Sequence, residues 1–426
     1  MTERFDDKRE AILDGAARLF NQHGIKGGLL SDLARRVGLA TNSLTYYYRR
    51  KEDLASACLE RAIDALCDIA IAAAEQRTLA QRIRFFFVGY LKLLADIADG
   101  RHAELIVFSD LLSLAPPHGT RMSEAYTQMF RHVRTLLDTP GQPRLDAPAR
   151  NARAHLLLST LSWARAWIAR YEPVDYARAA GQMADLLLFG LAAPGRAVAT
   201  TGASVIDIAP EFHGAADNAN DTRAAYLRAA TRLVNEHGYP GASVDRIAAE
   251  LQLTKGSFYH HHETKEELVA ACFERTFAVV RAAQSAALSS AGSGLERLAL
   301  ACRALLAYQM SPQGPLLRVT AWTGLPYAIR SDTRRTMGRL GERFGALVVE
   351  GMADGSMRIV DPSIAAQVVN GMVNAAAELE RWVPGAHAGN VFELYGLPLF
   401  TGLQTLPQTA ATRDPAATTL SSGARG

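Results

Sequence analysis

Residues 243–268 read SVDRIAAELQLTKGSFYHHHETKEEL, and the run of three histidines in this stretch, His260, His261 and His262, first suggests a metal site. On a helix, however, residues one and two positions apart point to different sides, and neighbours on one face are three or four apart. The three imidazoles therefore cannot close on one ion from a helix. We predict no metal site and no cofactor, and an earlier stretch of the chain explains the histidines better.

The chain contains a second copy of this stretch. FNQHG, residues 20–24, aligns with VNEHG, residues 234–238, and the alignment extends without gaps over residues 9–61 and 223–275, with 20 matches in 53 positions. The matched pairs include Leu13/Leu227, Arg18/Arg232, Ser43/Ser257, Lys51/Lys265 and Cys58/Cys272. A register this regular indicates a duplicated module.

Each copy has the pattern of a helix-turn-helix. An amphipathic helix ends at Gly24 or Gly238, the residue type that most readily takes a left-handed cap. In the second copy Ser243 is placed to cap the next short helix, whereas the first copy has Leu29 there. A tight turn, another short helix and a long helix opened by KEDL or KEEL follow. Two short helices joined by a tight turn form the helix-turn-helix shape.

Both copies resemble the DNA-binding head of the tetracycline-repressor (TetR) family of bacterial transcriptional regulators, loosely T-x-x-x-I-A-x-x-x-G-V-S-x-G-x-x-Y-x-H-F-x-x-K-E-x-L. In the second copy the pattern is matched by Ser243, Ile247, Ala248, Lys255, Gly256, Ser257, Phe258, Tyr259, His261, Lys265, Glu266 and Leu268, while Gln252 and His262 replace Gly and Phe. The first copy keeps Gly38, but has Asn42, Thr45, Tyr47 and Tyr48 in place of Gly, Tyr, His and Phe.

The resemblance implies a DNA-contacting role for the second short helix of each copy. Base edges would be read by Thr41, Asn42, Ser43 and Thr45 in one head and by Lys255, Ser257 and Tyr259, next to Gly256, in the other. Phosphates would be contacted by Tyr46, Tyr47, His260 and His261, and by Lys51 and Lys265 at the start of the fourth helix. Asn can pair with adenine and Lys with guanine, so the chemistry is consistent. Tyr48 and His262 are expected to pack each head on its fourth helix, and a pH-sensitive His262 is the alternative.

The remaining chain divides around these heads. We place head 1 at 8–54, a helical ligand-binding and dimerisation domain at 55–192, a linker at 193–220, head 2 at 221–268, a second helical domain at 269–405 and a disordered tail at 406–426. The fold class is all-α, with two TetR-like units. The helices at 150–170, 176–191, 363–381 and 390–403 should form a four-helix interface, so that the two halves pair within one chain.

The helical domains carry the candidate ligand site. In the family this region binds an effector, and pockets between helices are mostly apolar with a few polar groups. We select the aromatic residues Phe86, Tyr90, Phe108, Tyr126, Trp163, Tyr308, Trp322 and Tyr327. Polar candidates are His102, Ser109, Arg165, Asn370 and Asn374. The alternative for each aromatic residue is plain helix-bundle core, and the expected effector is a small apolar or aromatic molecule.

Composition limits the function classes. The net charge of +3 requires that any basic surface be local. Residues 1–54 hold ten Lys and Arg against eight Asp and Glu, and residues 221–268 hold six against seven, so neither head is strongly basic. Four cysteines without a C-x-x-C pair predict reduced core thiols. We find neither a signal-peptide pattern nor an apolar run that would span a membrane, and expect a cytoplasmic protein that associates with the nucleoid when bound to DNA.

These observations predict a ligand-responsive DNA-binding regulator, a repressor that reads double-stranded DNA at an asymmetric operator. The alternative is a helical small-molecule-binding or protein-adaptor module whose heads have lost DNA binding, and the weak head charge motivates it. An enzyme is not expected, because no G-x-S-x-G, H-E-x-x-H, P-loop or dinucleotide fingerprint occurs in the sequence.

Overall fold

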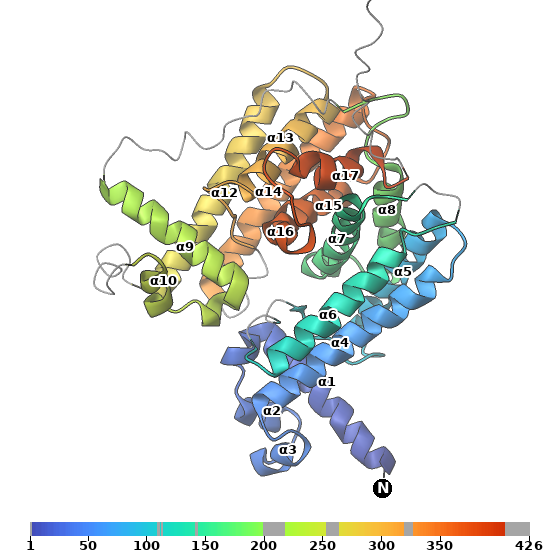
Figure 1. Ribbon diagram of the computed structural model, residues 1–426. Helices are drawn as coiled ribbons and strands as arrows, with labels where there is room; N and C mark the ends of the chain where they lie inside the picture. Colours follow the sequence, from blue (N-terminus) through green and yellow to red (C-terminus); the bar gives the residue numbers. More distant parts are fainter. Residues whose placement is uncertain are drawn as a thin grey trace, which may run out of the picture.

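The computed structural model describes residues 2–108, 111, 114–140, 144–198, 218–252, 264–318 and 327–404 (Figure 1). Within these ranges every regular element is a helix, and the one β-type contact is an isolated bridge between Ala192 and Met357. The expected all-α fold is therefore confirmed. In the described part of the chain no helix is both long and apolar enough to cross a membrane.

The first half is a head of three helices followed by a helical domain. The head consists of α1 (Thr2–Gly27), α2 (Leu30–Arg36) and α3 (Thr41–Tyr47), and the domain of α4 (Lys51–Ala74), α5 (Leu79–Ala98), α6 (His118–Thr135), α7 (Ala147–Trp163) and α8 (Tyr176–Phe189). Three single 3₁₀ turns, η2 (Ala164–Ala166), η3 (Ile168–Arg170) and η4 (Pro173–Asp175), join α7 to α8. The helix expected over 150–170 thus ends at Trp163.

The second half repeats this order. Its elements are α9 (Asn218–Gly241), α10 (Val244–Glu250), α12 (Lys265–Ser289), α13 (Gly294–Gln309), α14 (Tyr327–Ala353), α15 (Pro362–Ala375), η7 (Ala376–Glu378), α16 (Leu379–Trp382), the π-helical turn η8 (Phe392–Gly396) and α17 (Leu397–Thr401). The helices expected over 363–381 and 390–403 are therefore each broken into shorter pieces. In the last of them, Pro398 lies in the first turn of α17, where its missing N–H costs nothing.

Backbone geometry explains how each head turns. Gly24 (φ 72°) and Gly238 (φ 69°) break α1 and α9 where the sequence predicted a helix end, and one further helical turn follows each break. The Ser243 side chain accepts a hydrogen bond from the Arg246 amide (3.2 Å), while Leu29 gives α2 no side-chain cap. The predicted difference in capping between the two heads is confirmed.

The two halves pack on each other through the expected segments. Helix α15 crosses α7 and α8 of the first half, and Figure 1 shows α17 beside α8. The residues just after each of these two helices bond to the other helix. The Leu191 amide donates to the Leu399 carbonyl of α17 (3.1 Å), and the Leu403 amide donates to the Leu187 carbonyl of α8 (2.8 Å). Buried Arg153 adds a bond from its Nη1 to the same Leu403, at the carbonyl oxygen (2.8 Å).

Candidate functional site

Helix α3 of the first head presents a polar face to solvent. Asn42, Ser43 and Thr45 are exposed, whereas Leu44 between them is fully buried in the core of the head. The Thr45 hydroxyl donates to the Asn42 carbonyl (2.8 Å). α3 begins at Thr41. Three of the four predicted base-reading side chains of this head, Asn42, Ser43 and Thr45, are therefore accessible on one short helix, and the Thr41 side chain lies outside the described residues.

Two tyrosines at the end of α3 lie next to each other. Tyr46 is 79% exposed, and the ring of half-buried Tyr47 meets it edge-on with centroids 5.6 Å apart. Tyr48 is only 9% exposed, and its hydroxyl accepts a hydrogen bond from Arg9 Nε (3.3 Å). Tyr48 thus packs the head as expected, and most of the Tyr46 surface is exposed.

The equivalent lysines of the two heads both bond to backbone carbonyls near the end of the first helix of their head, although not at aligned positions. Lys51 Nζ donates to the carbonyls of Lys26 (2.9 Å) and Gly28 (3.3 Å), and Lys265 Nζ donates to the Tyr239 carbonyl while lying 4.2 Å from the centre of the Tyr239 ring. Burial lowers the pKa of Lys265. Sequence reasoning missed this structural role, in which each ammonium stabilises the end of the first helix of its head. A phosphate contact by either lysine stays a prediction.

The second recognition segment lies outside the described residues. This applies to the predicted DNA-contacting residues Lys255, Gly256, Ser257, Tyr259, His260 and His261, and to His262. The preceding turn is described, and it contains Gln252 with φ 55°, at the position that Gly38 (φ 67°) occupies in the first head. The replacement of the family's turn glycine therefore leaves the left-handed turn in place.

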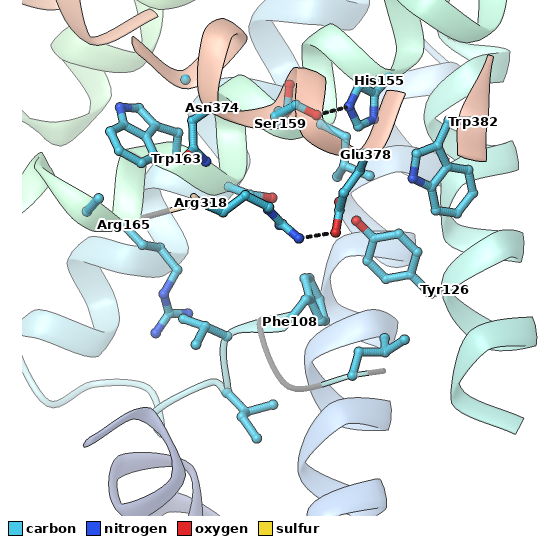
Figure 2. Close-up of a pocket in the computed structure, with 18 of the residues that line it drawn as sticks. Phe108, Tyr126, His155, Ser159, Trp163, Arg165, Arg318, Asn374, Glu378 and Trp382 are labelled. Atoms are coloured by element: carbon cyan, nitrogen blue, oxygen red, sulfur yellow. Dashed lines mark hydrogen bonds and ion pairs between the residues drawn. The ribbon is translucent and has the colours of Figure 1, made fainter. Parts of the chain in front are cut away.

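A cavity of about 370 Å³ lies where the two halves meet, and we call it the seam cavity (Figure 2). Helices α5, α6 and α7 and the loop after α5 form one wall, and α14, α15, η7 and α16 of the second half form the other. Its lining residues include Tyr90, Phe108, Tyr126, His155, Ser159, Trp163, Arg165, Arg318, Arg334, Asn374, Glu378, Arg381 and Trp382. Volumes of this order suit small organic ligands.

Aromatic side chains from both halves form one side of the cavity. Trp382 of α16 stacks on Phe130 of α6, with centroids 4.5 Å apart, and its ring lies 5.5 Å from that of Tyr126. Tyr126 in turn meets Phe108 edge-on at 5.3 Å. The Trp382 carbonyl accepts a hydrogen bond from Asn151 Nδ2 (3.0 Å). The second half therefore completes the aromatic wall of the first.

The lining also carries many polar and charged groups, and several of them are paired. Arg318 and Glu378 form an ion pair across the cavity, and Figure 2 shows Trp163 on one side of it and Tyr126 on the other. Arg165 pairs with Glu104 (2.6 Å) and donates to the Leu105 carbonyl (2.8 Å). Burial lowers the pKa of His155, so its ring is neutral near pH 7 and donates through Nε2 to the Ala375 carbonyl (3.1 Å).

The structure brings together part of the predicted ligand set. Tyr90, Phe108, Tyr126, Trp163, Arg165 and Asn374 line the seam cavity. Phe86 is fully buried against Phe87 in the core, and Tyr308 is buried with its hydroxyl bonded to Arg275 (3.0 Å), so the core interpretation holds for both. His102 and Asn370 are not among the lining residues. Trp322, Ser109 and the Tyr327 side chain lie outside the described residues.

One loop in each half connects this region to the heads. In the first half, Asn21 Nδ2 of α1 donates to the Leu105 carbonyl (3.0 Å) and Asn21 Oδ1 accepts from the Val107 amide (2.9 Å). In the second half, Asn235 of α9 makes the same two bonds, to the Leu316 carbonyl (2.9 Å) and from the Arg318 amide (2.9 Å). We call residues 104–108 and 315–318 the cavity loops, because Val107, Phe108 and Arg318 line the cavity.

A second matched pair of side chains holds the same loops. Arg61 Nη2 of α4 donates to the Glu104 carbonyl (2.5 Å), and Arg275 of α12 donates to the carbonyls of Pro315 (3.4 Å) and Gln313. Each cavity loop is thus bonded both to the first helix of a head and to the long helix that follows it.

A chain of Asp, Ser and His side chains elsewhere has the composition of a hydrolase triad. The Ser56 hydroxyl lies 3.0 Å from His118 Nδ1, and His118 Nε2 lies 3.3 Å from Asp53. Ser56 is only 1% exposed, so no substrate reaches its hydroxyl. These contacts instead join α4 to the start of α6.

Comparisons with known proteins agree with the two heads. The family model described as "Bacterial regulatory proteins, tetR family" matches residues 12–58 and 227–272, and "Tetracyclin repressor-like, C-terminal domain" matches residues 291–382. The Transposon Tn10 TetC protein of Escherichia coli is 33% identical over 66 residues, which are 16% of this chain and 34% of that protein. The HTH-type transcriptional repressor DhaR of Mycobacterium sp. (strain GP1) is 27% identical over 130 residues, 30% of this chain and 66% of that protein.

The chain therefore spans less than two-thirds of the length of either curated relative. Among solved structures, the TetR family transcriptional regulator PfmR from Thermus thermophilus is 26% identical with a TM-score of 0.35, and the match covers 42% of this chain and 98% of that one.

Proposed function

Since this chain belongs to the TetR family of bacterial transcriptional regulators and carries two of the family's N-terminal units, we propose that it is a one-component repressor with an effector site in the seam cavity. The two heads bind double-stranded operator DNA. An organic effector in the cavity changes the position of the heads and thereby the affinity for the operator. The protein acts in the cytoplasm, on the nucleoid.

The observation that carries this proposal is the pair of cavity loops. Each loop lines the cavity or continues into it, and each is bonded to the first helix of a head through Asn21 or Asn235. An effector that repositions Phe108 or Arg318 must therefore strain or move these bonds. Effector and operator affinities are then coupled, and the coupling is reciprocal. A ligand that left the loops unchanged would not change the affinity for the operator.

The sequences of the two heads support the proposal that each head binds a different DNA sequence. α3 exposes Asn42, Ser43 and Thr45, and the equivalent segment of the second head has the sequence TKGSFY in place of ATNSLT. A symmetric dimer reads a palindrome, because the site mirrors its two-fold axis. A chain with two different heads should prefer an asymmetric operator with two unlike half-sites, about one or two helical turns apart.

Pairing of the two halves within one chain would place two different heads in one molecule. The interface of α7, α8, α15 and α17 takes the place of a contact between two separate subunits. The linker expected at 193–220 spans on average about 30 Å, which suffices for such packing. Tethering raises the effective concentration of one half for the other, so we expect one chain to present both heads.

Selection of binding sites from random duplex DNA at fixed moderate salt tests the proposal. The purified protein is compared with its Asn42→Ala and Lys255→Ala variants. We expect an asymmetric site, and we expect each variant to weaken the sequence preference in one of its two half-sites. A perfect palindrome affected by one variant alone would refute the two-headed operator and indicate pairing between chains.

One observation favours a second candidate, a helical small-molecule-binding or adaptor module without DNA binding. Residues 221–268 carry more acidic than basic side chains, which disfavours phosphate contacts. DNA binding through phosphates makes log affinity fall linearly with log salt. No selected site and no salt-dependent affinity for any duplex would favour the adaptor over the repressor.

A further inference from the structure

The seam cavity has an uneven distribution of charge. Its interior holds the neutral ring of His155 and the Arg318–Glu378 ion pair. At its exposed edge, Arg334 of α14 and Arg381 of α16 reach the lining from two different helices. Arg381 lies over the Trp382 ring, 5.2 Å from its centre. Glu378 is the one acidic side chain among the described lining residues, so the cavity is positive at its opening.

The positive surface continues outside the cavity. Arg334 also borders a groove between the halves that is lined by Arg170 of η3 and by Arg335 and Arg339 of α14. All four arginines are exposed. The acidic groups nearby are Glu342, in the same groove, and Asp332, which pairs with Arg335 (3.7 Å). Guanidinium groups from both halves therefore line a groove that shares Arg334 with the seam cavity.

We propose that the effector is an organic anion with a large apolar or aromatic body, a ligand class that deepens the proposed function and rests on it. The body lies against Phe108, Tyr126 and Trp382. The acidic group, a carboxylate, sulfonate or phosphate, lies at the opening near the exposed Arg334 and Arg381, because the Arg318 guanidinium in the interior is already paired with Glu378. Guanidinium groups bind such anions well, since their forked donors match the anion's oxygens.

Two dyes that share one ring system test this ligand class without DNA. 8-Anilino-1-naphthalenesulfonate carries a sulfonate, and N-phenyl-1-naphthylamine is the same aromatic skeleton without it. Both are titrated by fluorescence into the full-length protein and into the double variant Arg334→Gln/Arg381→Gln. We expect the variant to weaken the sulfonate about tenfold at low salt and to leave the neutral dye unchanged, because two partly exposed charges near one anion contribute at that level.

A matched double variant removes equal charge elsewhere. Arg121→Gln/Arg178→Gln changes two exposed arginines on α6 and α8 and should leave both dyes unaffected. To locate the dyes, Ala166→Trp places a large ring at an exposed lining position and should weaken both of them.

Three results would overturn the ligand class. In Arg334→Gln/Arg381→Gln, the affinities for the two dyes could fall equally, or neither affinity could fall. In Ala166→Trp, the affinity for the sulfonate dye could remain unchanged. The test is separate from that of the proposed function. If the dyes behave as expected but no DNA site is selected, the ligand class is supported and the proposed repressor function is refuted. If a DNA site is selected but the arginine variant does not change the affinity for the sulfonate dye relative to the neutral dye, only the proposal of an anionic effector is refuted.

Discussion

Replacing Asn21 with alanine should release the first cavity loop from its head. The Asn21 amide makes two hydrogen bonds to the loop, to the Leu105 carbonyl (3.0 Å) and from the Val107 amide (2.9 Å). Each is worth about 0.5–1.5 kcal/mol in net stability, so their loss costs about 1–3 kcal/mol. If the cost falls on the loop alone, its opening equilibrium rises by roughly 5- to 150-fold, since about 1.4 kcal/mol is tenfold.

Hydrogen exchange followed by mass spectrometry measures this directly. Peptides that contain residues 104–108 should exchange faster in Asn21→Ala by that factor, while those that contain 315–318 keep the wild-type rate. Asn235→Ala should give the converse result. Gln22→Ala, an exposed neighbour on the same helix, serves as the matched control and should change neither loop.

The exchange pattern also has a clear refuting outcome. If Asn21→Ala leaves residues 104–108 unchanged, the two hydrogen bonds do not hold the loop. If both loops accelerate equally, the substitution destabilises the whole chain and the local connection from cavity to head is refuted. Where the loop alone is released, the effect of a bound effector on operator affinity should also weaken, because coupling free energies between sites are of the same size, about 1–3 kcal/mol.

Other predictions concern single residues. Gln252→Gly should raise the free energy of unfolding by about 1 kcal/mol, because a side chain at φ 55° is strained, and chemical denaturation measures it. Burial lowers the pKa of His155, so the unfolded chain takes up a proton below about pH 6.5 while the folded chain resists it, and stability falls as the pH falls. The free energy of unfolding, measured by chemical denaturation between pH 7.5 and 5.5, should fall more steeply in the wild type than in His155→Gln, by at most about 1.4 kcal/mol per pH unit. Tyr46→Ala should weaken operator binding in an anisotropy titration without changing stability, whereas Leu44→Ala should cost about 2–5 kcal/mol of stability, and the reverse pattern would contradict the assignment of the two faces of α3.

The sequence predicted the helix breaks of both heads and the packing role of Tyr48 because these features are local. Leu44 and Tyr48 are buried and Asn42 and Tyr46 exposed, as the three- and four-residue spacing requires. The kinks at Gly24 and Gly238 could be predicted for the same reason, since a left-handed residue favours glycine. The replacement at Gln252 shows the limit of this reasoning, because the left-handed conformation is kept there by a residue type that disfavours it.

The seam cavity could be predicted only in part. Tyr90, Phe108, Tyr126 and Trp163 stood out as aromatic residues in amphipathic helices, yet the same pattern selected Phe86, which is core. Sequence alone cannot separate a core aromatic from one that lines a cavity. Among the residues it missed are His155, Arg318, Glu378 and Trp382, which come from segments expected to form the interface or left unassigned. Their joint position depends on how the halves pack, and no local signal carries that information.

The internal repeat separates what the two heads share from what they do not. Asn21/Asn235 and Arg61/Arg275 are identical, and each pair makes the same loop contacts in its own half. The Cys58 and Cys272 thiols likewise donate to the equivalent carbonyls of Leu13 (3.7 Å) and Leu227 (3.5 Å), and burial raises the pKa of Cys58 to about 12 and of Cys272 to about 11.

The segments that would face DNA differ instead, ATNSLT against TKGSFY. The two copies keep the same contacts between head and cavity loop but differ in the residues that would face DNA. This combination suits a protein in which one effector acts on two heads that bind different DNA sequences. A single anion in the cavity between them would then act on both heads through matched loops, while each head contacts its own half of an asymmetric site. This arrangement predicts that Asn21→Ala and Asn235→Ala weaken the effector response on different half-sites, which footprinting of the selected operator measures. Loss of both half-sites together in either variant would mean that the heads respond as one rigid unit.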